Sequence, residues 1–133
     1  MSIKLKKLLI TVVVFAMFTT AAYAAQNFTV TGAVQGAGYN DCHYSTEMSY
    51  KSNYSNATLE VTSGPVYNRC VIYAYVTKHD DINYGTYFGI YTGTGTQSLK
   101  YRNTASSCYC KVGAMIQRGC YFNKANVAGS FTP

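Results

Sequence analysis

Several residue types are scarce in this chain, and each shortage excludes a class of function. Only 12% of the 133 residues are charged, with 11 Lys and Arg against 5 Asp and Glu. A nucleic-acid-binding domain of this size carries many more Lys and Arg, usually clustered on one face. Five acidic residues leave little material for paired-carboxylate catalysis. The absence of Trp argues against a dedicated platform for stacking sugars.

The N-terminus has the organisation of a secretory signal peptide. Lys4, Lys6 and Lys7 precede an apolar run at 8–18, and Ala22-Tyr23-Ala24 places small side chains where signal peptidase requires them. The run is too short for the roughly 20 residues of a membrane-spanning helix, so we expect cleavage after Ala24, without stable membrane insertion. Residues 25–133 then form a single secreted domain, with 8 Lys and Arg against 5 acidic residues and a net charge of +3.

Alternation of apolar and polar side chains with period two dominates residues 25–133, and helical periodicity is absent. The segments 57–62 and 70–77 are clear examples, and the second is apolar enough on both faces to be a central strand. Turn signals such as Ser63-Gly64-Pro65 separate the segments. Seven to nine short strands at this spacing predict an all-β fold, an antiparallel β-sandwich or small barrel.

Two finer predictions concern faces and pairing. Alternation over 42–51 predicts a strand with one buried face and one exposed face, and Lys51 belongs to the exposed face. The residues predicted to be buried are Cys42, Tyr44, Met48 and Tyr50. Residues 120–123 are predicted to pair with the preceding strand across a turn at 118–119, and 127–132 to close a sheet edge.

The five cysteines are Cys42, Cys70, Cys108, Cys110 and Cys120. Export permits disulfides, so we expect two bridges that support the sandwich and one thiol that stays free or links two chains into a covalent dimer. The pairing stays open, with Cys110–Cys120 and Cys42–Cys70 among the possibilities. Cys108 and Cys110 share a strand face with Cα atoms about 6.5 Å apart, near the upper limit for a bridge. We therefore expect them to face different partners, and one of them to be the free thiol.

Two groups of residues have metal-ligand chemistry without the spacing of a known site. Cys108, Cys110 and Cys120 with a His would supply soft ligands, but the Cys-x-Cys spacing differs from paired Cys-x-x-Cys knuckles. The run 81–85 begins like a calcium loop but lacks the later bidentate Glu. We predict neither a metal site nor a cofactor.

No group of residues predicts catalysis either. His43 is next to Cys42, but neighbours in a strand point to opposite faces and cannot form a nucleophile–base pair. His79 precedes Asp80 and Asp81 in a polar loop, without a recognisable nucleophile motif. We therefore expect the protein not to be an enzyme.

Tyrosine is the positive clue to function, since all but one of the 14 Tyr lie in residues 25–133. Tyr offers a large contact area with a polar tip at low entropic cost, which binding surfaces exploit. Five of them fall on the strand faces opposite the most apolar ones and form the candidate binding face: Tyr73, Tyr75, Tyr87, Tyr91 and Tyr109. The alternative is that Tyr–Thr cross-strand pairs simply fill the outer faces of the sheets.

A turn at 62–65 after a strand, the Ala74-Tyr75-Val76 segment and the ending at 129–133 resemble small exported β-rich proteins of Gram-positive bacteria, of uncharacterised function. The predicted signal peptide and sandwich, with the Tyr, Ser and Asn richness, are also similar to bacteriocins of the lactococcin 972 type. The chain departs from the first group in having Phe131 instead of Trp and in having cysteines, and from the second in lacking Trp. Neither resemblance assigns a role to a residue.

These observations predict a secreted, non-enzymatic binding protein that acts at a cell surface or in the extracellular medium. Its expected partner is a cell-wall or other envelope component, because the domain is mildly cationic. The alternatives are a bacteriocin-like toxin that acts on a competitor's envelope and, third, a small extracellular hydrolase.

The cleavage site gives a direct test. N-terminal sequencing of the secreted protein is expected to begin Ala25-Gln26-Asn27, because the small side chains before this point satisfy signal peptidase. Protein that begins at Met1 in a membrane fraction would contradict both the predicted localisation and the predicted charge of the domain.

Overall fold

The computed structural model describes residues 25–51, 55–65, 70–78, 85–103, 107–121 and 123–133. The predicted signal peptide and the loop with His79, Asp80 and Asp81 lie outside the described residues. The described chain forms one short 3-10 helix, η1 (Tyr39–Asp41), and nine strands. The strands are β1 (Gln26–Gly36), β2 (His43–Tyr44), β3 (Ser49–Lys51), β4 (Ala57–Ser63), β5 (Ile72–Lys78), β6 (Gly89–Tyr91), β7 (Gly95–Leu99), β8 (Cys108–Gln117) and β9 (Lys124–Thr132).

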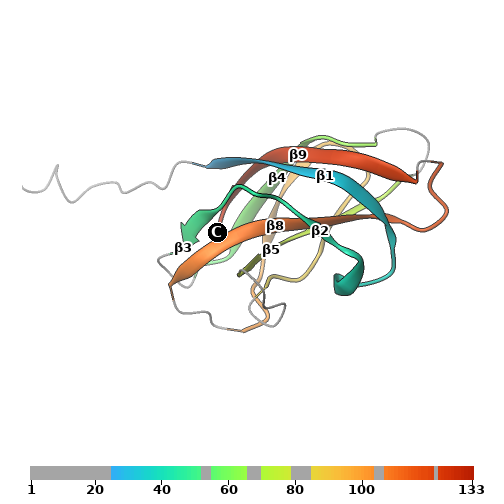
Figure 1. The fold of residues 1–133 in the computed structure, drawn as a ribbon. Helices are drawn as coiled ribbons and strands as arrows, with labels where there is room; N and C mark the ends of the chain where they lie inside the picture. Colours follow the sequence, from blue (N-terminus) through green and yellow to red (C-terminus); the bar gives the residue numbers. More distant parts are fainter. Residues whose placement is uncertain (1–24, 52–54, 66–69, 79–84, 104–106, 122) are drawn as a thin grey trace, which may run out of the picture.

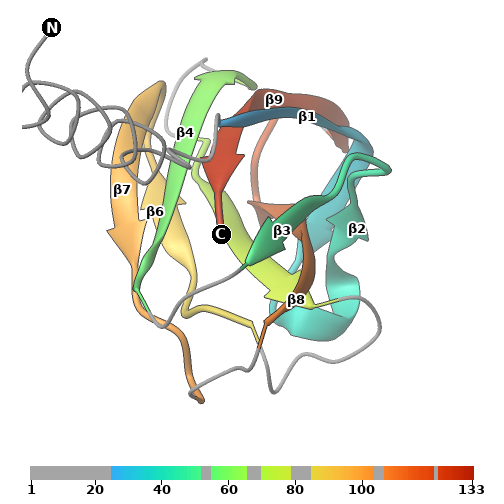
Figure 2. The same ribbon diagram turned by 90° about the vertical axis from the view of Figure 1, so that its left-hand side faces the viewer.

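The strands form an all-β sandwich that nearly closes on itself, as the alternation predicts (Figure 1 and Figure 2). The first sheet has the order β1-β9-β4-β7, and the second contains β6, β5 and β8, with β2 and β3 also paired to β8. β1 joins the two sheets: it runs antiparallel to β9, and its last two residues run parallel to β8. The crossing follows a register shift between Val30 and Ala33, where Gly32 has a φ of +66° that L side chains rarely adopt.

The core lies between the inner faces of the two sheets. In β4, Ala57, Leu59 and Val61 point inward and are buried, while Thr58 is exposed, in agreement with the predicted alternation. β5 is a central strand between β6 and β8, also as predicted. The largest fully buried apolar side chains between the sheets are Phe131, Leu59, Ile72, Ile116, Val30, Val61, Val76, Val112 and Val127.

The prediction for 42–51 is wrong about which face is buried. Tyr44 and Tyr50 do share one face, but it is the outer face of the second sheet, where both side chains are partly exposed. Met48 is also exposed, and only Cys42 of the predicted set is buried. Lys51 instead points into the interior and is only 1% exposed. Period two separates two sets of side chains without showing which set is buried. Here Ser45 and Lys51 of the polar set are buried, and Lys51 finds partners in the interior.

Two predicted pairings are also wrong. The turn at 118–119 forms, with Gly119 at a φ of +83°, but the described residues 120, 121 and 123 do not lie in a strand. The chain after this turn crosses to the first sheet, so β9 does not form a hairpin with β8. β9 therefore lies between β1 and β4 and is not a sheet edge.

One disulfide, Cys70–Cys120, is present among the described residues, where the sequence predicts two bridges. Its Cα atoms are 5.1 Å apart, because the start of β5 lies beside the end of β8, where Ile72 pairs with Ile116. The pairings Cys110–Cys120 and Cys42–Cys70 do not form. Cys42, Cys108 and Cys110 are free thiols. The sequence predicts only one free thiol, either Cys108 or Cys110, but both of them are free. A bridge that spans 50 residues stabilises the fold by about 2–4 kcal/mol.

Gly129 in β9 tests the central position of this strand. A Cβ atom at Gly129 would collide with the backbone carbonyl of Glu60 in β4, so Gly129→Ala should lower the free energy of unfolding by about 1–3 kcal/mol. Gly95→Ala in β7 is the matched control, because open space surrounds its Cβ position. Urea unfolding of the two variants measures the difference. Equal stabilities would contradict the close pairing of β9 and β4.

Candidate functional site

The outer face of the second sheet is built around Tyr75, which lies across β8 at a position without a side chain. Tyr75 of β5 is the register partner of Gly113 of β8. A Cβ atom at Gly113 would lie 2.5 Å from the Tyr75 ring and 2.9 Å from the Tyr44 ring. Glycine at this position therefore allows two aromatic rings to pack directly on the strand backbone.

Other aromatic rings enclose Tyr75 and exclude it from solvent. Its ring centroid lies 4.7 Å from that of Tyr39 and 5.1 Å from that of Phe88, and the rings of Tyr39 and Phe88 stack on each other. The hydroxyls of Tyr44 and Tyr75 are 2.8 Å apart and share a hydrogen bond. We call these packed residues the aromatic layer: Tyr39, Cys42, Tyr73, Tyr75, Phe88 and Met115; the Tyr44 ring packs on the layer from outside.

Burial also determines the protonation of Tyr75. Loss of solvation raises its pKa well above the ordinary value, and the hydrogen bond with Tyr44 raises it further. The phenol thus stays neutral as a fixed partner for the Tyr44 hydroxyl. The sheet consequently has an apolar layer on both sides, which holds the outer face rigid.

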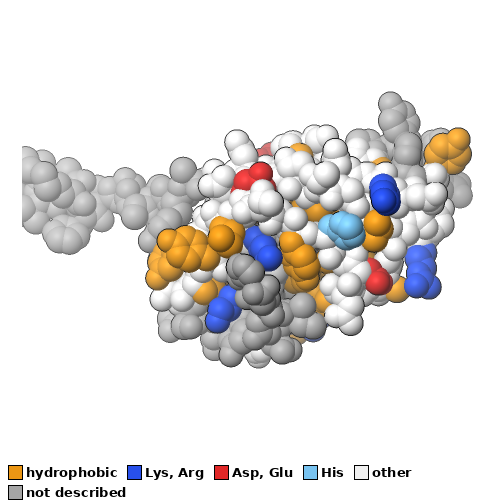
Figure 3. All heavy atoms as spheres, viewed as in Figure 1, with side chains coloured by type: hydrophobic (Ala, Val, Ile, Leu, Met, Phe, Trp, Pro, Cys, Tyr) orange, Lys and Arg blue, Asp and Glu red, His pale blue; other side chains and the backbone are white. Residues whose placement is uncertain are grey.

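Exposed side chains on the part of this face formed by β2, β3 and β8 are those of Tyr44, Tyr50 and Tyr109, with Lys111 beside them; we call this group the rim. Tyr50 and Tyr109 are cross-strand partners whose ring centroids are 5.2 Å apart, and they are 41% and 59% exposed. The Lys111 Nζ atom lies 4.8 Å from the centroid of the Tyr44 ring. Figure 3 shows hydrophobic side chains gathered over β3 and β8, with Lys or Arg side chains next to them.

Arg102 provides a second cation at the other side of the aromatic layer. Its guanidinium carbon lies 4.3 Å from the Tyr39 ring centroid and 5.0 Å from that of Tyr87, and its Nε donates to the Tyr39 hydroxyl at 2.9 Å. Burial raises the pKa of Tyr39, and Arg102 partly opposes this effect. Tyr87 and Ile90 remain exposed here.

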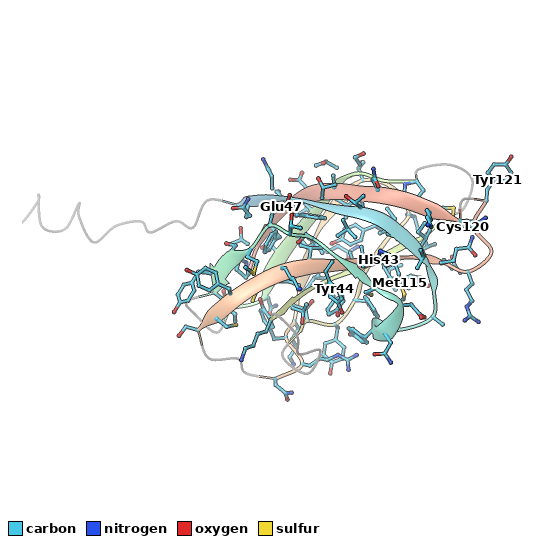
Figure 4. All side chains as sticks on the ribbon, in the orientation of Figure 1. His43, Tyr44, Glu47, Met115, Cys120 and Tyr121 are labelled. Carbon is cyan, nitrogen blue, oxygen red and sulfur yellow. A yellow bond between two sulfur atoms is a disulfide. The ribbon has the colours of Figure 1, made fainter. Side chains whose placement is uncertain are left out.

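The described carboxylates nearest this face are engaged with backbone N–H groups. Glu47 accepts from the N–H of Thr29 at 3.3 Å, and Figure 4 shows it beside β1. Asp41 accepts from the N–H of Ala37 at 2.7 Å. The cations of this face therefore interact with aromatic rings, which leaves their charge available to an anionic ligand.

The structure places the five predicted tyrosines in three different environments. Tyr87 and Tyr109 are exposed, and Tyr73 is half-buried beside Phe88. Tyr75 and Tyr91 are buried, so their assignment to a binding surface is wrong. Tyr91 points into the interior and donates to the carbonyl of Leu59 at 2.8 Å, because β6 presents this residue to the core.

The sequence pattern does not identify most of the rim. Alternation predicts that Tyr44 and Tyr50 are buried, and Lys111 has no signal by itself. Glycine at 113 in an otherwise apolar strand is the clue that was available, because a missing side chain in a central strand often marks the close approach of another group.

A second cluster of polar groups is buried at the end of the interior where β3 meets β8. Lys51 Nζ donates to the carbonyl of Ser55 at 3.0 Å and lies 4.0 Å from the Tyr101 ring centroid. The sulfur atoms of Cys108 and Cys110 are 3.7 Å apart in the same cluster. Burial lowers the pKa of Lys51 and raises that of Cys110 to about 12.

Within the described part of the chain, no three His, Cys, Asp or Glu side chains gather so as to hold a metal ion. No helix there is long and apolar enough to span a membrane. Comparisons with models of protein families, with curated proteins and with solved structures gave no match.

The buried phenol of Tyr75 predicts a specific dependence of stability on alkaline pH. Below pH 10 the phenol is protonated in both states, but above it the unfolded chain loses a proton that the folded chain keeps. Each such tyrosine lowers the free energy of unfolding by about 1.4 kcal/mol per pH unit. Tyr75→Phe should reduce this slope by that amount and, through the lost hydrogen bond, cost about 1 kcal/mol at pH 7.

Urea unfolding at pH 7 and at several values above pH 10 measures both effects. Tyr121→Phe is the matched control, since Tyr121 is 90% exposed, and its slope should equal that of the wild type. An unchanged slope in Tyr75→Phe would show that the Tyr75 phenol is not buried in solution.

Proposed function

We propose that this protein is a secreted, non-enzymatic binding protein whose rim holds an anionic glycopolymer of a cell envelope. The observation that carries the proposal is the exposure of three tyrosine rings beside Lys111, on a sheet that is packed on both sides. Large exposed apolar groups on a rigid support are typical of binding surfaces.

The rim tyrosines are pre-organised for binding. Tyr50 and Tyr109 rest edge to face against each other, and the Tyr44 hydroxyl is hydrogen-bonded to Tyr75. Ordering a side chain on binding costs about 0.5–1.5 kcal/mol, and part of this cost is already met in the free protein. Their hydroxyl tips remain able to donate and accept hydrogen bonds.

The chemistry of the rim favours a polymer with both sugar faces and negative charge. Aromatic rings pack against the C–H faces of sugars or polyols, and the Lys111 ammonium pairs with a phosphate or carboxylate. The net charge of +3 in residues 25–133 adds a general attraction to an anionic surface. Phenols and an ammonium group provide binding contacts but no acid–base pair at neutral pH, which favours binding over catalysis.

Two observations support secretion. The N-terminal 24 residues have the pattern of a signal peptide, and the Cys70–Cys120 disulfide suits an oxidising compartment. Polymers of the cell envelope are anionic and abundant where an exported protein leaves the cell, so they suit a surface with aromatic rings and a positive charge.

Replacing the paired rim tyrosines should abolish most of the binding. Tyr50→Ala/Tyr109→Ala should weaken retention on envelope fragments about tenfold or more, because two central aromatic contacts are lost. Tyr121→Ala is the matched control: it removes an exposed tyrosine at the far end of the molecule from β3 and should bind like the wild type (Figure 4). Lys111→Gln should bind more weakly and with a smaller dependence on salt.

Sedimentation with purified envelope fragments at two salt concentrations measures these effects. Wild-type protein that is not retained on any envelope fraction would refute the proposal, and so would an equal loss in Tyr121→Ala. Growth inhibition of a strain panel by the purified protein would indicate the toxin alternative instead.

A further inference from the structure

We infer that Cys108 and Cys110 form a thiol–disulfide exchange site, a dithiol that low-molecular-weight disulfides oxidise to a bridge within the chain. The two sulfur atoms are 3.7 Å apart, which is van der Waals contact. The side chains thus converge on each other, contrary to the expectation that each faces a different partner. A bond between them requires only a small further approach.

The position of Cys108 makes this approach feasible. Cys108 is the first residue of β8, and it pairs with Lys51, the last residue of β3. Cα atoms two residues apart in a regular strand are about 6.5 Å apart, inside the range of 4.4–6.8 Å observed for disulfides. A bend at a strand end disrupts few ladder hydrogen bonds, so the remaining strain is local.

The difference in exposure between Cys108 and Cys110 determines which of the two thiols reacts first. Cys108 is partly exposed, whereas Cys110 is completely buried. A disulfide in solution can therefore reach Cys108 first, and Cys110 is held in contact to complete the exchange. Burial raises the pKa of the Cys110 thiol, and the positive charge of Lys51 partly opposes this effect, which favours the reactive thiolate of Cys110.

The exchange balances in two steps. The Cys108 thiolate attacks one sulfur of a small disulfide RSSR, forms a mixed disulfide and releases RS⁻. Cys110 then attacks the Cys108 sulfur, which forms the Cys108–Cys110 bond, and the departing second RS⁻ takes up the Cys110 proton and leaves as RSH. Two protein thiols are oxidised, and RSSR is reduced to two RSH.

The third thiol, Cys42, lies outside this site. It is buried within the aromatic layer on the outer side of the sheet, and burial raises its pKa to about 12. The Cys70–Cys120 disulfide lies near the opposite end of β8. Closure of the new bridge would leave Cys42 as the single unpaired cysteine, a buried thiol that is slow to react.

Oxidised glutathione provides the test, with native full-length protein, intact mass measurement and peptide mapping. The wild type should lose two hydrogens, carry no glutathione, and map to a Cys108–Cys110 bridge. Cys110→Ala should instead retain one glutathione on Cys108, because the resolving thiol is missing. Cys108→Ala should react at least about tenfold more slowly, since the buried Cys110 is left alone.

Cys42→Ala is the control and should behave like the wild type. Protein purified with the bridge already closed should open with reduced glutathione and then close again in the same assay. Wild-type protein that keeps a stable glutathione adduct would overturn the inference, as would one that fails to react or maps its new bridge to Cys70 or Cys120. The wild-type result decides the matter even where a variant does not fold.

Discussion

The packing of Tyr75 against the bare backbone of Gly113 is the contact on which the outer half of this protein depends. Because β8 has no side chain at that position, the rings of Tyr75 and Tyr44 lie directly on the strand. Tyr39 and Phe88 then close over Tyr75. The second sheet, which would otherwise have one face exposed to solvent, is therefore packed on both sides. The rim lies on the aromatic layer that packs on its outer side.

A second constraint is the shortage of acidic residues, which changes how the cations are accommodated. Lys51, Lys111 and Arg102 all lie over tyrosine rings. A cation on a ring keeps its charge and part of its solvation, whereas a cation paired with a carboxylate is neutralised. A chain rich in Tyr and poor in Asp and Glu is therefore stabilised internally while its outer face remains positive.

Local patterns in the sequence predicted the all-β fold, the faces of β4 and the central position of β5, because these depend on alternation alone. They could not show which side of 42–51 is buried, since period two separates two sets of side chains without saying which one meets the core. The buried Lys51 depends on Tyr101, which is fifty residues away in the chain. The pairing of the cysteines could not be predicted either, because it also depends on contacts between distant parts of the chain: Cys70 comes close to Cys120 only once β5 and β8 are paired. For the candidate site, alternation found Tyr109 and Tyr87 but also selected the buried Tyr75.

Nuclear magnetic resonance mapping of the bound protein tests most directly whether the rim is the working surface. Titration of isotope-labelled protein with soluble anionic envelope glycopolymer should shift the amide signals of β2, β3 and the first half of β8. The aromatic layer beneath should shift less, because it is already packed. Shifts confined to β4 and β7, at the far edge of the first sheet, would contradict the central claim.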